Sequence, residues 1–187
     1  MAEGPLEGLR VLDLCDGQGA LCARILADLG ADVVKVEPPA GDPSRRDGLA
    51  WVAVNANKRS VTADLATPGG RERFLRLATA ADVVVESFAP GRLASLGLDF
   101  PALAGANPRL VLVSITPYGQ DGPLAAAPAS DLEVTAASGA LSLAGDPGGP
   151  PLRTTLPQSG LWAGMYGAAG ALAALAARER TGRGQHV

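Results

Sequence analysis

The chain has 187 residues, of which 47% are hydrophobic and 4% aromatic, so we expect one domain with an aliphatic core. Its net charge of −3 argues against nucleic acid as a partner, because nucleic-acid-binding domains usually carry a basic face. No apolar run typical of a signal peptide opens the chain. The apolar segment 160–177 is interrupted by glycines and has no polybasic flank, so we expect no membrane partner.

The two cysteines, Cys15 and Cys22, are not accompanied by a cysteine–histidine set with metal-ligand spacing. We therefore expect no metal site and interpret both as small buried residues. Free thiols suit a reducing compartment, so we expect a cytoplasmic location.

Strand signals and helix signals alternate from the beginning of the chain to its end. Short runs rich in Val and Leu, with short connections, indicate parallel strands covered by helices. The predicted strands are residues 9–14, 31–37, 82–86 and 110–116. The predicted helices are residues 20–29, 67–80 with Thr67 as N-cap, 102–106, 131–142 and 161–178. The pattern predicts a Rossmann-like, doubly wound α/β domain with a mainly parallel sheet.

A glycine turn, GQGALC at residues 17–22, joins the first predicted strand to the first helix. It is close to the dinucleotide fingerprint G-x-G-x-x-G, and Glu37 stands where that fingerprint has an acid for the ribose. However, Cys22 replaces the third glycine, and Glu37 lies in a proline turn. The turn alone therefore leaves open an NAD site, a general phosphate-facing turn, or a tight turn without a ligand.

Six stretches carry a more specific signal: PLEGLRVLDL, LADLGADVVKVEPPAGDPSR, NANKRSVTADLATPGGRERFLRL, ADVVVESFAPGRLASLGLDF, NPRLVLVSITPYGQDGP and RERTGRGQHV. Together they resemble family III CoA-transferases, the family of formyl-CoA transferase, carnitine CoA-transferase and 2-methylacyl-CoA racemase. The resemblance covers the whole chain, in order and at family spacing. It implies that the glycine turn serves coenzyme A or acyl-CoA, held as a substrate or ligand and not as a tightly bound cofactor.

The resemblance implies a coenzyme A site built from three loops. In residues 16–19, backbone N–H groups would face the thioester end or the pantetheine. Residues 58–59 and 63–65 would lie near the adenine and the phosphates, and residues 87–91 would flank the adenine. The implied binding residues are Asp16, Gly17, Gln18, Lys58, Arg59, Ala63, Leu65, Ser87, Phe88, Pro90 and Gly91.

Basic residues in predicted loops also suit a ligand with several phosphate charges. These residues are Arg45, Arg46, Lys58, Arg59 and Arg92. For each of them the alternative interpretation is a solvated surface charge, and this alternative is stronger for Arg45 and Arg92 than for Lys58 and Arg59.

The family's catalytic step requires a side chain that this chain lacks. The family's transferases attack the acyl-CoA thioester with the aspartate of a P-x-x-D-x-x-x-G pattern, since a carboxylate is a good nucleophile at neutral pH. Here Pro157 and Gly164 match the ends of the pattern, and Gly160 stands at the nucleophile position. Ser159 would be rotated by about 100° around the helix and lacks a base, because the single histidine is His186. We therefore predict no catalytic residue.

Racemases of the family use the histidine of a G-H-D sequence together with the same aspartate. This chain has ASD at residues 129–131, so both proton-transfer groups are missing and racemase is the least expected activity. We interpret Asp131 as a helix N-cap rather than a catalyst.

Family members are about twice this length. We therefore expect residues 1–187 to be the N-terminal CoA-binding portion of the large domain, without the second, small domain. Family protomers interlock as dimers, so we expect a homo- or hetero-oligomer in which an aspartate-bearing CoA-transferase subunit supplies the chemistry. The alternatives are an active transferase that uses another nucleophile or a partner's residue, a non-catalytic scaffold subunit, and an NAD oxidoreductase.

Overall fold

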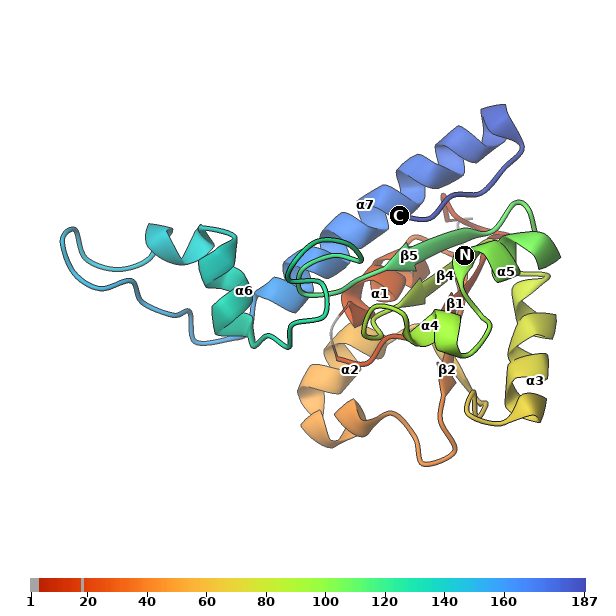
Figure 1. Cartoon of the computed structure of the whole chain (residues 1–187), viewed down its shortest axis with the longest axis horizontal. Helices are drawn as coiled ribbons and strands as arrows, with labels where there is room; N and C mark the ends of the chain where they lie inside the picture. The colour runs from red at the N-terminus through yellow and green to blue at the C-terminus, as the bar shows by residue number, and fades with distance from the viewer. Residues whose placement is uncertain (1–3, 18) are drawn as a thin grey trace.

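In the computed structural model, which describes residues 4–17 and 19–187, five parallel strands form one sheet (Figure 1). The strands are β1 (Arg10–Asp13), β2 (Asp32–Glu37), β3 (Arg59–Thr62), β4 (Val83–Glu86) and β5 (Val111–Ser114). Their order is β3-β2-β1-β4-β5, so the direction of winding reverses between β1 and β4. This order confirms the predicted Rossmann-like α/β fold and puts the topological switch point at β1.

Helices connect the strands and extend beyond the sheet. They are α1 (Ala20–Asp28), α2 (Leu49–Asn55), α3 (Pro68–Ala78), α4 (Arg92–Ser95), α5 (Phe100–Ala106), α6 (Asp131–Ala137) and α7 (Ser159–Thr181), with short 3-10 turns η1 (Pro43–Asp47) and η2 (Ala140–Leu143). In Figure 1, α6 and the segment around it project away from the sheet, while α7 runs back along it.

The hydrophobic core consists of two layers, one on each face of the sheet. Successive side chains of a strand point to opposite faces, so neighbouring residues of β1 enter different layers. Val11 packs in the layer formed with Leu26 of α1 and Ala171 of α7. Leu12 packs in the other layer, beneath Phe74 of α3. Helices α1 and α7 therefore cover one face, and α3 and α5 cover the other.

Small residues let α7 approach α1 and β5 closely. A Cβ added to Gly164 would lie 2.9 Å from the Leu21 Cβ, and one added to Gly167 would lie 2.8 Å from the Ile115 Cδ1 and 3.4 Å from the Cys22 Sγ. Cys22 occupies the position of the third fingerprint glycine, and it is fully buried. The space for its thiol comes from the glycines of α7, which explains why a third glycine is not needed in α1.

By length and hydropathy, α7 could cross a membrane. Its buried residues are mainly small ones, and this face packs against α1 and β5. The prediction of a buried helix at this position is confirmed for that face. The first half of the helix also exposes apolar side chains, among them Met165 and Tyr166.

The structure confirms one local prediction and differs from the sequence signals at other local elements. Thr67 is confirmed as the N-cap of α3, since its Oγ1 accepts a hydrogen bond from the Gly70 N–H at 3.1 Å. Helix α2 covers residues that the periodicity left unassigned, and its half-buried Val54 packs against the α1–α7 layer. The single helix predicted at 131–142 is divided into α6 and η2, because Gly139 adopts a φ of 80°.

Two neighbouring glycines of α3 provide a matched test of this packing. A Cβ on Gly70 would overlap the carbonyl oxygen of Asp64, whereas a Cβ on Gly69 would meet nothing within 4 Å. We predict that Gly70→Ala lowers the free energy of unfolding by about 2 kcal/mol or more, because the 63–66 loop must move. Gly69→Ala is expected to raise it by up to about 1 kcal/mol through helix propensity. Urea unfolding of both variants tests this pair, and equal effects would contradict it.

Candidate functional site

A cavity of about 320 Å³ opens at the carboxyl ends of β1, β2 and β3, beside the segment that follows β4. Its walls are mostly apolar and include Leu14, Val36, Pro38, Ala63, Leu65, Phe88 and Leu96. Ligands of open parallel sheets bind at this edge, close to the switch point. The fold therefore places this cavity where an α/β protein would hold a ligand.

Several of the predicted binding residues meet at this cavity. Asp16, Ala63, Leu65 and Phe88 line it. Ser87 joins two of the predicted loops, because its Oγ donates to the Asp16 Oδ1 at 2.9 Å and accepts from the Asp16 N–H at 3.1 Å. The loops after β1, β3 and β4 thus meet at one cavity.

Other predicted residues lie outside the lining of this cavity. Gly91 lines a second, smaller cavity of about 100 Å³ and precedes α4. Gly17 and Pro90 line neither of these cavities. Gln18 lies outside the described residues.

Lys58 and Arg59 are adjacent in sequence, but their side chains go to different places, and neither reaches the cavity. The Lys58 Nζ is buried and donates to the Asp13 Oδ2 at 2.7 Å. Arg59 begins β3 and pairs with Asp32, which begins β2, at the amino ends of these strands. The cavity lies at the opposite ends. These two side chains therefore do not form the phosphate-binding group that the sequence suggested.

The sequence analysis missed Lys35 and Asp42, which line the cavity from β2 and the loop after it. Glu37 and Arg92, considered there as a ribose acid and as a loop cation, also line the cavity. The stretch VEPPAGD could have indicated Asp42, because it leaves the end of a buried parallel strand whose carboxyl end borders the switch point. Arg92 is exposed, and it brings a positive charge to the rim.

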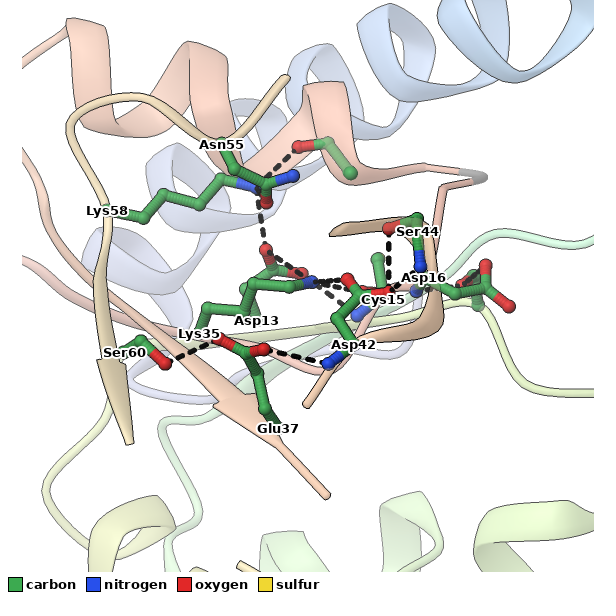
Figure 2. A network of polar contacts seen from close by, with 12 residues as sticks. Asp13, Cys15, Asp16, Lys35, Glu37, Asp42, Ser44, Asn55, Lys58 and Ser60 are labelled. Atoms are coloured by element: carbon green, nitrogen blue, oxygen red, sulfur yellow. Dashed lines mark hydrogen bonds and ion pairs between the residues drawn. The ribbon is translucent and has the colours of Figure 1, made fainter. Parts of the chain in front are cut away.

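A network of buried charges lies beneath the cavity (Figure 2). The Lys35 Nζ forms an ion pair with the Asp42 Oδ2 at 2.8 Å, donates to the Cys15 carbonyl oxygen at 2.5 Å, and lies 3.9 Å from the Asp13 Oδ2. Burial opposes the charged form of Lys35, but the carboxylates of Asp13 and Asp42 outweigh it and raise the pKa of the lysine. Lys35 is therefore a permanent cation in this network.

Glu37, the candidate ribose acid, is already fully engaged. Its carboxylate accepts two hydrogen bonds from the Arg45 guanidinium at 2.6 and 2.7 Å, one from the Ser60 hydroxyl and one from the Asp42 N–H. Arg45 in turn stacks over the Trp51 ring, 4.2 Å from its centroid. These partners, Arg45 foremost, lower the pKa of Glu37 to about 2. A ribose would have to displace them, which disfavours the NAD interpretation.

The start of α7 contains the position of the missing nucleophile. Gly160 is the second residue of this helix. The Asp131 Oδ1 accepts hydrogen bonds from the Gln158 N–H at 2.7 Å, the Ser159 N–H at 2.8 Å and the Ser159 Oγ at 2.8 Å. Burial opposes ionisation of Asp131, but these bonds dominate and lower its pKa.

These contacts correct the interpretation of Asp131 as the N-cap of its own helix. Ser130 caps α6, in a capping box with Glu133, and Asp131 instead caps the start of α7. The Ser159 hydroxyl donates to Asp131, and His186 lies at Ser114, with 2.9 Å between the Nε2 and the Oγ. Ser159 therefore has no histidine base.

The fold and the position of the cavity define a Rossmann-like α/β protein with a ligand site at its switch point. Residues 6–187 match the model of the family described as CoA-transferase family III. The chain belongs to this family, which confirms the resemblance seen in the sequence.

Three similar proteins are named as CoA-transferases or as subunits of them. The chain is 45% identical to the succinyl-CoA:(R)-benzylsuccinate CoA-transferase subunit BbsE of Thauera aromatica, over 95% of this chain and 46% of that protein. It is 42% identical to the acetyl-CoA:oxalate CoA-transferase of Acetobacter aceti, over 99% and 50%. It is also 42% identical to the beta subunit of the succinyl-CoA–L-malate CoA-transferase of Chloroflexus aurantiacus, over 98% and 48%. The chain thus spans about half the length of these relatives.

Solved structures agree with this assignment. A CAIB/BAIF family protein from Brucella suis superposes with a TM-score of 0.94 at 37% identity, over 99% of this chain and 52% of that one. The hypothetical protein Rv3272 from Mycobacterium tuberculosis superposes with a TM-score of 0.90 at 39% identity, over 98% and 53%.

The pair of buried Glu37 and half-exposed Arg45 predicts a pH dependence of stability. Folding lowers the pKa of Glu37 from its ordinary 4.5 to about 2, so the ionised carboxylate stabilises the fold above about pH 4.5. This contribution is lost as the pH falls toward 2. We predict that Glu37→Gln lowers the free energy of unfolding by about 2 kcal/mol at pH 7, since water screens the half-exposed Arg45, and that the gap to the wild type narrows between pH 4.5 and 2.

Denaturant unfolding at several pH values measures this gap. Glu72→Gln is the control, because Glu72 forms an exposed pair with Arg76 on α3 and is expected to change stability by less than about 0.5 kcal/mol. If the difference in free energy of unfolding between the wild type and Glu37→Gln stays constant down to pH 2, the lowered pKa of Glu37 is contradicted.

Proposed function

We propose that this chain is the coenzyme A- or acyl-CoA-binding domain of a family III CoA-transferase, and that it does not perform acyl transfer alone. The observation that carries the first half is the cavity at the switch point, where three loops implied by the family resemblance meet. Its volume of about 320 Å³ lies within the range of small-molecule sites, roughly 300–1,000 Å³. No tightly bound cofactor is part of the proposal.

The charges around the cavity favour one orientation of the nucleotide. Besides Glu37 and Asp42, the walls carry the carboxylates of Asp16 and Asp64. Two like charges ~4 Å apart near a protein surface repel by about 4 kcal/mol, so phosphates avoid such walls. We therefore place the uncharged adenine in the apolar part of the cavity, against the Phe88 ring. The phosphates then turn outward to the exposed guanidinium of Arg92.

The second half of the proposal rests on Gly160. In the family's first step a carboxylate oxygen attacks the thioester carbonyl, the C–S bond breaks, coenzyme A leaves as the thiolate, and an acyl anhydride remains. Gly160 offers no oxygen for this attack, and the neighbouring Ser159 hydroxyl is bound to Asp131. An aspartate-bearing CoA-transferase subunit would supply the carboxylate in a homo- or hetero-oligomer. Two relatives are named as subunits of CoA-transferases, which supports a multi-subunit enzyme.

The location proposed for this enzyme is the cytoplasm, where the buried free thiols of Cys15 and Cys22 stay reduced. A non-catalytic scaffold subunit is the second candidate function. The blocked carboxylate of Glu37 makes an NAD oxidoreductase the weakest candidate.

Calorimetric titration with coenzyme A tests the binding claim. We predict that Phe88→Ala and Arg92→Gln each raise Kd about tenfold, or about 1.4 kcal/mol, because the first removes the adenine contact and the second a charge on the phosphates. Arg76→Gln, an exposed change on α3 outside the cavity lining, is the matched control and is expected to leave Kd unchanged. No heat at millimolar coenzyme A would reject the binding claim and favour the scaffold.

Intact-protein mass spectrometry after incubation with acetyl-CoA or succinyl-CoA tests the catalytic claim. We expect the wild type to gain no acyl group, and Gly160→Asp to gain one, because the new carboxylate can accept the acyl group. Gly160→Asn is the matched control, since its amide has similar size but is not an acyl acceptor of this kind. An acylated wild type, or an inert Gly160→Asp variant that still binds coenzyme A, would contradict the proposal.

A further inference from the structure

We propose that Lys35 and Lys58 are positioning residues that hold the described residues of the glycine turn after β1, namely Asp16, Gly17 and Gly19, in a ligand-binding shape. The inference rests on the proposed coenzyme A site, and it assigns to these lysines a task other than phosphate binding. Neither ammonium group needs to contact the ligand. Each acts on the backbone that flanks the turn.

The two lysines, both shown in Figure 2, donate hydrogen bonds to the backbone on either side of the turn. The Lys35 Nζ donates to the carbonyl oxygen of Cys15, directly before the turn, at 2.5 Å. The Lys58 Nζ donates to the carbonyl oxygen of Ala20, directly after it, at 2.8 Å. A four-residue turn thus has both flanking carbonyls fixed by buried cations from different elements, one on β2 and one before β3.

Both ammonium groups lie near the same carboxylate, that of Asp13. The Asp13 Oδ2 lies 2.7 Å from the Lys58 Nζ and 3.9 Å from the Lys35 Nζ. The Asp13 Oδ1 accepts the N–H of Cys15 at 2.9 Å. The backbone entering the turn is therefore held at its amide by Asp13 and at its carbonyl by Lys35. Because Asp13 ends β1 at the switch point, this frame is anchored in the centre of the sheet.

The turn needs such a frame because its own sequence provides little stiffness. Glycine has more backbone freedom than any other residue, and Gly19 adopts a φ of 75°, which most side chains avoid. A Cβ there would also lie 3.0 Å from the Ile115 Cδ1. Glycine is thus required for shape, and rigidity has to come from outside the turn. A binding site whose amides are already oriented loses less entropy when the ligand arrives.

Lysine is suited to this task in a way that an apolar residue is not. A buried ion pair is often no more stabilising than a well-packed apolar pair, so stability alone does not account for two of them. An ammonium group has three donors and no acceptor. Lys58 uses all three, on Asp13, on Ala20 and on the Asn55 Oδ1 at 2.9 Å. The hydrogen bonds from the two ammonium groups thus fix the orientation of the carbonyl groups on either side of the turn.

The frame is also continuous with the cavity. Lys35 and its partner Asp42 both line the cavity wall, and Asp16 of the turn lines it as well. The proposed site therefore has a fixed edge on the side of the turn. This edge corresponds to the part of coenzyme A that the family resemblance assigns to residues 16–19, the pantetheine and the thioester.

The test removes Lys58 and the carboxylate that it shares with Lys35, while Lys35 keeps its pair with Asp42. In the double variant Asp13→Asn/Lys58→Met both charges disappear together, while an amide oxygen stays available for the Cys15 N–H. The matched control is Arg59→Met, because Arg59 is the next residue and forms an exposed pair with Asp32. Calorimetry compares two probes: coenzyme A, and adenosine bisphosphate as its nucleotide part without pantetheine.

We expect the double variant to raise Kd for coenzyme A about tenfold and to leave Kd for adenosine bisphosphate within about twofold, and we expect the control to change neither. Equal weakening of both probes would show a general loosening of the domain and would overturn the positioning role. Unchanged binding of coenzyme A would overturn it as well.

Amide order parameters from NMR relaxation decide the role independently of any ligand. We expect Gly17 and Gly19 to show rigid values of about 0.85 in the wild type and to fall toward about 0.6 in the double variant, with no change in Arg59→Met. If the wild type does not bind coenzyme A, the proposed function fails, and unchanged order parameters would separately overturn the frame. If the double variant does not fold, Asn55→Ala removes one of the three Lys58 acceptors and is expected to lower both glycine values, while unchanged values overturn the proposal.

Discussion

The buried carboxylate of Asp13 is the constraint on which the site depends. It ends the central strand at the switch point and has no exposed surface. An isolated charge there would be expensive, so cations must reach it from outside β1. Lys35 does so from β2 and Lys58 from the segment before β3. Satisfying one carboxylate therefore draws β2, the segment before β3 and the glycine turn into one arrangement, and the cavity opens on its edge.

The start of α7 is also held in place by one carboxylate. Asp131 holds the start of α7 through two backbone amides and the Ser159 hydroxyl. The close contact between α7 and α1 then depends on Gly164 and Gly167. The chain thus keeps the scaffold that would present a nucleophile at position 160, and a glycine stands there. The cavity and position 160 thus belong to different elements of the fold.

The sequence predicted most of the fold but only part of the site. The parallel strands, the Thr67 cap and the family could be recognised because they depend on local periodicity, on capping chemistry and on long ordered motifs. The cavity residues Asp16, Ala63, Leu65 and Phe88 followed from the family resemblance. Helix α2 could not be recognised, because its seven residues are stabilised mainly by docking on α1. The role of Asp131 was assigned to the wrong helix, since its partners are 27 and 28 residues away.

The sequence by itself determined the family, the parallel α/β architecture and the presence of glycine at position 160, because each of these is written in contiguous residues. Only the tertiary structure decided which charges face the cavity. Lys58 and Arg59 are neighbours, yet one ammonium is buried on Asp13, 45 residues away, and the other cation pairs with Asp32 at the surface. Successive side chains point to opposite sides of an extended backbone, and a buried carboxylate attracts whichever cation the fold brings within reach. This pairing is a long-range property that residue order does not reveal.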